Sequence, residues 1–165
     1  MWRRVRKLAA VPFAIKLLMI EAFFYLAWAR ILKAVPFARI APSLGIQMEE
    51  TPWESDPAVQ DLQSQISYVV RLVSRYTWWE CQCLVMAIAA MKMMRRRRIE
   101  STLYLGTGRD RNGSMIAHAW LRSGPYYITG YETMSRFTIV GTFACYPGRS
   151  AAGYKKSQRS LGNEH

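Results

Sequence analysis

Cysteine and histidine are scarce in this chain of 165 residues, which has three cysteines and two histidines. The number of cysteines is odd, and Cys81 and Cys83 are too close in sequence for an ordinary disulfide bond with each other. Ligands of a zinc site usually have at least two residues between them, so the pair is also a poor metal site. We therefore expect no disulfide framework, no metal and no other cofactor, and a reducing, cytoplasmic environment.

Acidic residues are also few, since 11 aspartates and glutamates stand against 23 lysines and arginines, for a net charge of +12. The positive charge is clustered in MWRRVRK at the start, RRRR at 95–98 and YKKSQR near the end. Such clusters suit an acidic peptide, a protein surface, anionic lipid or nucleic acid, and they are equally typical of a solvated surface. No nucleic-acid-binding motif is present, so we expect no nucleic-acid partner.

A long uncharged run is missing from the N-terminal region, although that region is rich in apolar residues. Lys16 and Glu21 interrupt it, and its longest uncharged pieces, 8–15 and 22–29, have eight residues each. A membrane-spanning helix needs about 20 apolar residues, so this segment does not span a membrane. The two charges also argue against a secretory signal peptide.

Residues 13–33 nevertheless have the composition of a helix. Their basic residues share one narrow arc, and most of the remaining circumference is apolar, so the helix must be buried against the protein, a partner or a membrane interface. Glu21 on this apolar face is either a hydrogen-bonded internal group or a contact to a basic partner. We name Glu21 and Tyr25 as candidate partner-binding residues, and peripheral association with a membrane surface stays open.

The remaining pattern predicts helices followed by strands. Asp56 and Pro57 are an N-cap and a first-turn residue for an amphipathic helix that ends near 75, and a second helix is predicted over 82–97. The period then changes to strands at 101–106, 114–122, 126–129 and 137–145. This order predicts an α+β fold with an antiparallel meander. We divide the chain into a helical extension (1–50), a main domain (51–145) and a flexible basic tail (146–165).

The cysteines in ECQCL directly precede an apolar helix, and His118 in AHAWL lies on a predicted strand. The N–H groups and the dipole at a helix start favour a thiolate, and the same N–H groups suit the oxyanion of an attacked carbonyl. The dipole alone is too weak to form a complete thiolate at neutral pH, so a nucleophilic cysteine needs an adjacent imidazolium. A free cysteine is also a common core residue, and these residues alone leave both readings open.

Three longer stretches add a family resemblance. CLVMAIAAMKMMRRRRIESTLYLG, AHAWLRSGPYYITG and FTIVGTFA together resemble the leader peptidases of lasso peptide biosynthesis, which are transglutaminase-like cysteine proteases. LMIEAFFYLAWARILKAVPFARIAPSLG is more loosely similar to the helical lead-in of their stand-alone form.

The resemblance implies a transglutaminase-like or papain-like cysteine protease core that removes the leader from a precursor peptide. Its nucleophile falls on Cys83 and its base on His118. Implied partners are the precursor as substrate, a separate leader-recognition protein and an ATP-dependent cyclase that closes the macrolactam.

The family often has an aspartate as third catalytic residue on the strand after the histidine, whereas this chain has Ile-Thr-Gly there. Thr129 and Glu132 are the first candidates to orient the imidazole, followed by Asp110. We place Gln82 at the oxyanion site and Trp120 at the cleft, where it is equally suited to plain packing.

A different class of function competes with catalysis. The basic and apolar N-terminal helix is also typical of a non-catalytic adaptor that docks on a partner protein or on a membrane surface.

Overall fold

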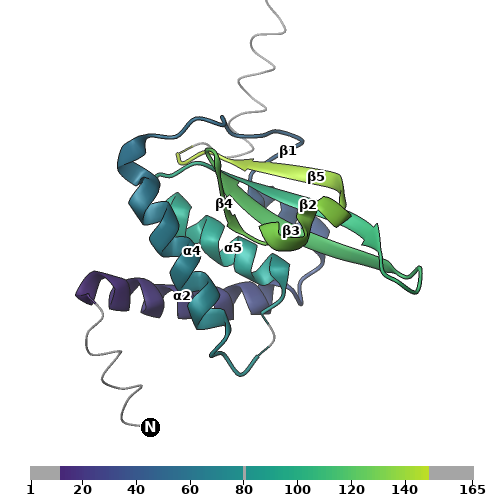
Figure 1. Ribbon diagram of the computed structural model, residues 1–165, viewed down its shortest axis with the longest axis horizontal. Coiled ribbons are helices and arrows are strands. Elements are labelled where there is room, and N and C mark those ends of the chain that lie inside the picture. Colours follow the sequence, from purple (N-terminus) through teal and green to yellow (C-terminus); the bar gives the residue numbers. More distant parts are fainter. Residues whose placement is uncertain (1–11, 80, 149–165) are drawn as a thin grey trace, which may run out of the picture.

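The computed structural model describes residues 12–79 and 81–148, and Figure 1 shows their arrangement. In chain order, the elements are α2 (Phe13–Leu32), α3 (Phe37–Leu44), β1 (Ile46–Gln47), the 3-10 helix η1 (Pro57–Val59), α4 (Gln60–Ser74), α5 (Cys83–Arg96), β2 (Ser101–Arg109), β3 (Met115–Ser123), β4 (Tyr126–Thr129), the 3-10 helix η2 (Tyr131–Arg136) and β5 (Thr138–Cys145). Helices precede an antiparallel sheet, which confirms the predicted α+β class.

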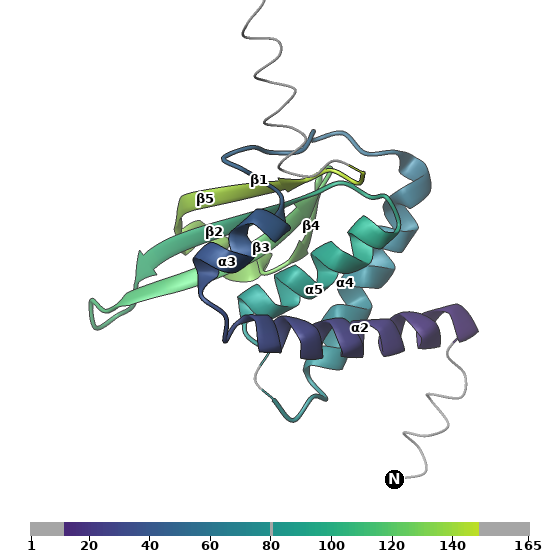
Figure 2. The ribbon, with the colours of Figure 1, turned by 180° about the vertical axis from the view of Figure 1, so that it is seen from behind.

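The molecule has a sheet layer and a helical layer, with α2 outermost (Figures 1 and 2). Helices α4 and α5 contact the sheet, and α2 contacts α4 and α5 from their other side. Leu18, Ala22, Leu26 and Ala29 of α2 are buried in the same core as the sheet residues. The helix predicted as an extension therefore shares one hydrophobic core with the main domain. The basic segment 1–11, and the predicted tail from residue 149 onward, lie outside the described residues.

The helices begin where the sequence indicates. Asp56 Oδ1 accepts a hydrogen bond from the Ala58 N–H at 2.9 Å, and Pro57 occupies the first turn of η1, which leads directly into α4. In α5, small residues such as Ala89 and Ala90 are fully buried, which allows the helix to approach its neighbours closely. Among the described residues, no helix is both long and apolar enough to cross a membrane.

The sheet order is β1-β5-β2-β3-β4, so the predicted meander is wrong in one respect. After β4 the chain turns at Gly130, passes through η2 and returns as β5 beside β2 instead of beside β4. The two-residue strand β1 pairs with the other side of β5. It begins directly after Gly45, which ends α3.

The sheet face opposite α5 is closed by a buried arginine. Arg122 is fully buried and lies 4.0 Å from the centroid of the Trp53 ring. Its guanidinium donates to the carbonyl oxygens of Thr51 and Gly124, each at 2.8 Å, and its Nε donates to the Tyr104 hydroxyl at 2.9 Å. These bonds fix residues 50–53 against the strands, because a buried cation without partners would be strongly unfavourable.

Candidate active site

Cys83 is the first residue of α5, and its side chain is half-buried. The preceding Gln82 makes no side-chain capping bond, so it does not compete for the N–H groups of the first turn. Its Oε1 instead accepts a hydrogen bond from Lys33. The neighbouring Cys81 thiol lies 3.2 Å from Thr77 Oγ1, whereas the structure gives Cys83 Sγ no hydrogen bond within the described residues. Of the two thiols, Cys83 is therefore the one at a helix start without a competing bond.

His118 lies on β3, and its ring is held by hydrogen-bonding and aromatic contacts. Its Nε2 is 2.7 Å from the Gly130 carbonyl oxygen and 3.3 Å from Thr133 Oγ1. The ring stacks against Phe137, at a centroid distance of 4.9 Å, and against Trp120, at 5.9 Å. Because a carbonyl only accepts hydrogen bonds, Nε2 carries the hydrogen, and Nδ1 is the basic nitrogen of the neutral ring.

Two glycines make room for this arrangement. Gly130 has φ 73°, in the left-handed region that favours glycine, and a Cβ at this position would lie 2.5 Å from the Ala119 carbonyl oxygen. Gly106 pairs with His118 across the β2–β3 ladder. A Cβ there would lie 2.9 Å from both the Trp120 ring and Phe137 Cβ. Side chains at either position would displace the groups that hold the imidazole.

The structure does not bring Cys83 and His118 into hydrogen-bond contact, since no bond within the described residues joins Sγ to the ring. Ala119 and Leu121 belong to the core shared with α5. Successive side chains of a strand alternate between faces, so His118 shares the opposite face with Trp120. Pairing with β4 ends at Leu121, so at His118 the strand β3 is paired only with β2.

The expected third members do not bond to the imidazole. The Thr129 hydroxyl is buried with no hydrogen-bond partner, and Glu132 instead forms a 3.4 Å ion pair with Arg71. Asp110 accepts bonds from the N–H groups of its own turn between β2 and β3. The orienting group is the backbone carbonyl of Gly130. A glycine directly after a strand indicates a turn, but the sequence does not say which group its carbonyl meets.

Trp120 and the candidate partner residues also differ from expectation. Trp120 is 4% exposed and stacks on Tyr104 at 5.5 Å, so it supports the ring of His118 and does not line an open cleft. Glu21 is bound internally, because Arg97 Nη1 donates to its Oε1 at 3.0 Å and Nη2 to its Oε2. Tyr25 is half-buried against the core. Of the two roles expected for Glu21, the structure therefore contains the hydrogen-bonded internal group and not the contact to a separate basic partner.

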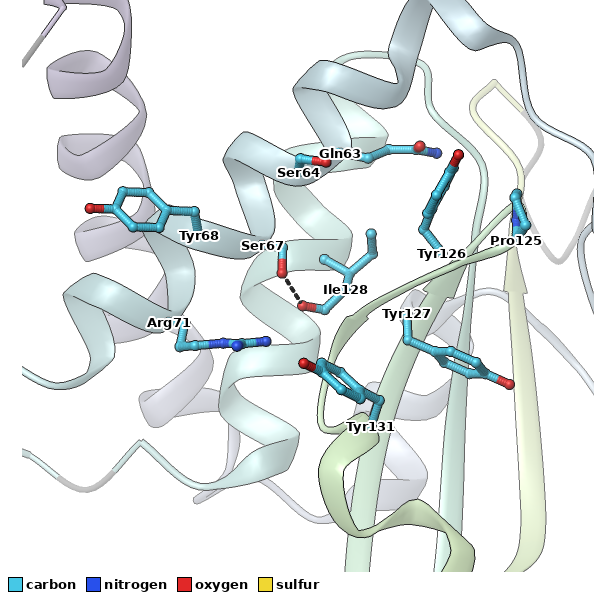
Figure 3. A pocket seen from close by; sticks show the side chains of 10 residues that line it. All are labelled: Gln63, Ser64, Ser67, Tyr68, Arg71, Pro125, Tyr126, Tyr127, Ile128 and Tyr131. Carbon is cyan, nitrogen blue, oxygen red and sulfur yellow. Dashed lines mark hydrogen bonds between the residues drawn. The ribbon is translucent and has the colours of Figure 1, made fainter.

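An open groove of about 510 Å³ lies between α4 and the segment from Pro125 to Tyr131 (Figure 3). Midway along it, Ser67 Oγ donates to the Ile128 carbonyl at 2.6 Å. At one end the Arg71 guanidinium lies 5.5 Å from the centroid of the Tyr131 ring. Neither Cys83 nor His118 lines the groove. Tyr131 follows Gly130 directly, however, so the groove ends beside the residue that holds the imidazole.

Comparison with protein families identifies the class of this domain. The model of the transglutaminase-like superfamily matches residues 23–142, a segment that includes both Cys83 and His118. The chain therefore belongs to the transglutaminase-like superfamily, which includes cysteine peptidases and acyltransferases. No curated protein and no solved structure matches the chain. Over residues 12–79 and 81–148, no group of three or more histidine, cysteine or acidic side chains is placed to hold a metal ion.

Proposed function

We propose that this protein is a cysteine peptidase that removes the leader from a lasso peptide precursor. The observation that carries the proposal is the imidazole of His118, which is oriented through Nε2 by Gly130 and so presents Nδ1 as a base. It is found in a transglutaminase-like domain whose Cys83 begins a helix. The likeness of this segment to lasso leader peptidases supports the choice of substrate.

In the proposed reaction, His118 Nδ1 takes the thiol proton and Cys83 Sγ attacks the carbonyl carbon of the scissile peptide bond. The N–H groups at the start of α5 hold the oxyanion of the tetrahedral intermediate. As the C–N bond breaks, His118 returns the proton to the leaving amine, and a thioester remains on Cys83. Water activated by His118 then hydrolyses the thioester, which releases the leader with a carboxylate and restores the thiol.

This mechanism requires the thiol and the imidazole to meet in the substrate complex. Catalytic hydrogen bonds are often long or badly aligned without substrate and shorten only when it binds. The imidazole lies on the sheet face opposite α5, so the two groups meet only if this part of β3 rotates in the substrate complex. Pairing with β4 ends at Leu121 and does not hold this part of β3 in place.

The groove beside α4 is the proposed path of the substrate. Its volume falls within the range of ligand sites, about 300–1,000 Å³. It also ends at Tyr131, next to Gly130. An extended leader lying along β4 would therefore reach the imidazole at its scissile end. The proposed partners are a leader-recognition protein that delivers the precursor and a cyclase that acts on the product.

The test compares Cys83→Ala with Cys81→Ala, a matched loss of a half-buried thiol two residues away. Each variant is incubated with precursor and recognition protein, and the products are identified by mass spectrometry. We expect no leader removal by Cys83→Ala and full activity of Cys81→Ala. Leader removal by Cys83→Ala would end the proposal. A released leader that carries an amide from an added amine, and never a carboxylate, would instead identify an acyltransferase.

A further inference from the structure

The outer face of α2 is a continuous apolar surface. Six large side chains, each between 39% and 75% exposed, follow one another at intervals of three or four residues and form what we call the α2 stripe: Phe13, Leu17, Ile20, Phe24, Trp28 and Ile31. At 1.5 Å per residue the stripe is about 27 Å long. Figure 2 shows that α2 runs across the side of α4 and α5 that faces away from the sheet.

A helix at a protein–water boundary usually buries its large apolar side chains and exposes small or polar ones, and α2 does the opposite. Two of its four buried residues are alanines, Ala22 and Ala29, whereas its phenylalanines and its tryptophan point outward or lie half-buried. Contiguous exposed apolar surface of this kind marks an interaction site. Nothing within residues 12–79 and 81–148 covers the stripe, so it is suited to contact with a further surface.

The charges around the stripe are positive. Glu21 is the only carboxylate in α2, and Arg97 neutralises it. Arg30 is exposed near the end of the helix, and the Lys92 ammonium lies 5.2 Å from the centroid of the Trp28 ring. The sequence before α2 adds four basic residues between positions 3 and 7. The complementary surface is therefore both apolar and anionic.

We propose that the α2 stripe docks on the surface of a membrane that contains anionic lipids. Phenylalanine, tryptophan and leucine on one face with flanking lysine and arginine are typical of helices that lie in the membrane interface. The helix is unable to span the membrane, so it lies parallel to the surface. A second copy would bring the same positive flanks together in a chain whose net charge is +12, which disfavours dimerisation through this face.

Docking in this orientation leaves His118 and the groove accessible, whereas Cys83 lies in the helical layer, where the neighbouring Gln82 accepts a bond from Lys33 directly after α2. Helices α4 and α5 separate α2 from the sheet (Figures 1 and 2). His118 on β3 and the groove beside β4 would therefore face the aqueous side. This inference concerns where the enzyme works and does not depend on the proposed peptidase reaction.

The test measures co-sedimentation of the full-length protein with vesicles of phosphatidylglycerol and phosphatidylcholine in equal parts, and with vesicles of phosphatidylcholine alone. We expect binding to the anionic vesicles that weakens with added salt, because salt screens the charges. The double variant Phe24→Ser/Ile31→Ser should bind at least about tenfold more weakly, since it removes two apolar side chains from the contact. Met115→Ser is the matched control, because Met115 is 76% exposed but lies on the sheet.

Thermal unfolding of each variant checks that the fold is intact, which we expect because both substituted side chains point outward. Absence of binding to anionic vesicles would overturn the proposal, as would equal binding by wild type and the double variant. A concentration-dependent dimer that the double variant abolishes, with no vesicle binding, would assign the stripe to a second copy and would also overturn it.

Discussion

Replacement of Gly130 by alanine tests whether its close approach to β3 sets the position of the His118 ring. The new Cβ would lie 2.5 Å from the Ala119 carbonyl oxygen and 3.1 Å from Trp120 Cβ. A side chain in the left-handed region costs about 1–2 kcal/mol. The close contact with a backbone oxygen destabilises the folded state by about a further 1–2 kcal/mol. We expect the free energy of unfolding to fall by about 2–4 kcal/mol.

Gly113→Ala is the matched control. Gly113 has φ 80°, close to that of Gly130, but a Cβ at this position would have no atom within 4 Å, so alanine there encounters only the backbone cost. At about 2–4 °C per kcal/mol for a chain of this size, Gly130→Ala should melt several degrees below Gly113→Ala. Differential scanning calorimetry of the two variants gives this difference directly.

The activity of the same variants reports on the imidazole. A shift of the Gly130 carbonyl releases Nε2, and a misplacement of about 1 Å in a catalytic group costs on the order of 100-fold in rate. We expect kcat/KM for precursor cleavage to fall by about that factor in Gly130→Ala and to stay unchanged in Gly113→Ala. If Gly130→Ala cleaves the precursor normally and has the same melting temperature as Gly113→Ala, the reasoning about this glycine is wrong.

Further predictions concern the sheet and the third cysteine. Arg122→Leu leaves the carbonyls of Thr51 and Gly124 without their buried donor, so urea unfolding should show a loss of about 3–5 kcal/mol. Burial raises the pKa of Tyr104 to about 12, whereas a phenol in the unfolded chain ionises near pH 10. The contribution of Tyr104 to the free energy of unfolding is therefore fully present below about pH 10 and is lost as the pH rises toward 12. In urea unfolding at several pH values, Tyr104→Phe should lack this part of the decline. Burial also raises the pKa of the Cys145 thiol, so peptide mapping should show slower alkylation at Cys145 than at Cys83.

Features that depend on neighbouring residues were predictable. The Asp56–Pro57 start, the apolar period of α4 and the alternation in β3 each arise from a few consecutive positions, and the structure has all three. The place of Cys83 at the start of α5 follows in the same way. Helix periodicity and capping are local, so a single sequence is sufficient to locate them.

Contacts between distant segments were not predictable. Glu21 and Arg97 are 76 positions apart, and only the packing of α2 along α5 shows that the carboxylate has an internal partner. The Thr129 and Glu132 side chains are near His118 in sequence, yet a backbone carbonyl takes the position at Nε2. A backbone group leaves no signature in residue type, so no inspection of side chains would have found it.

The sequence by itself determined the three long helices, the four long strands and the family to which the domain belongs, because these depend on local periodicity and on motifs. The tertiary structure decided that β5 lies beside β2, that Gly130 orients His118, and that the bulky side of α2 faces outward. Each of these depends on the free energy of packing segments far apart in the chain, and many pairings of the same elements satisfy the local pattern equally well.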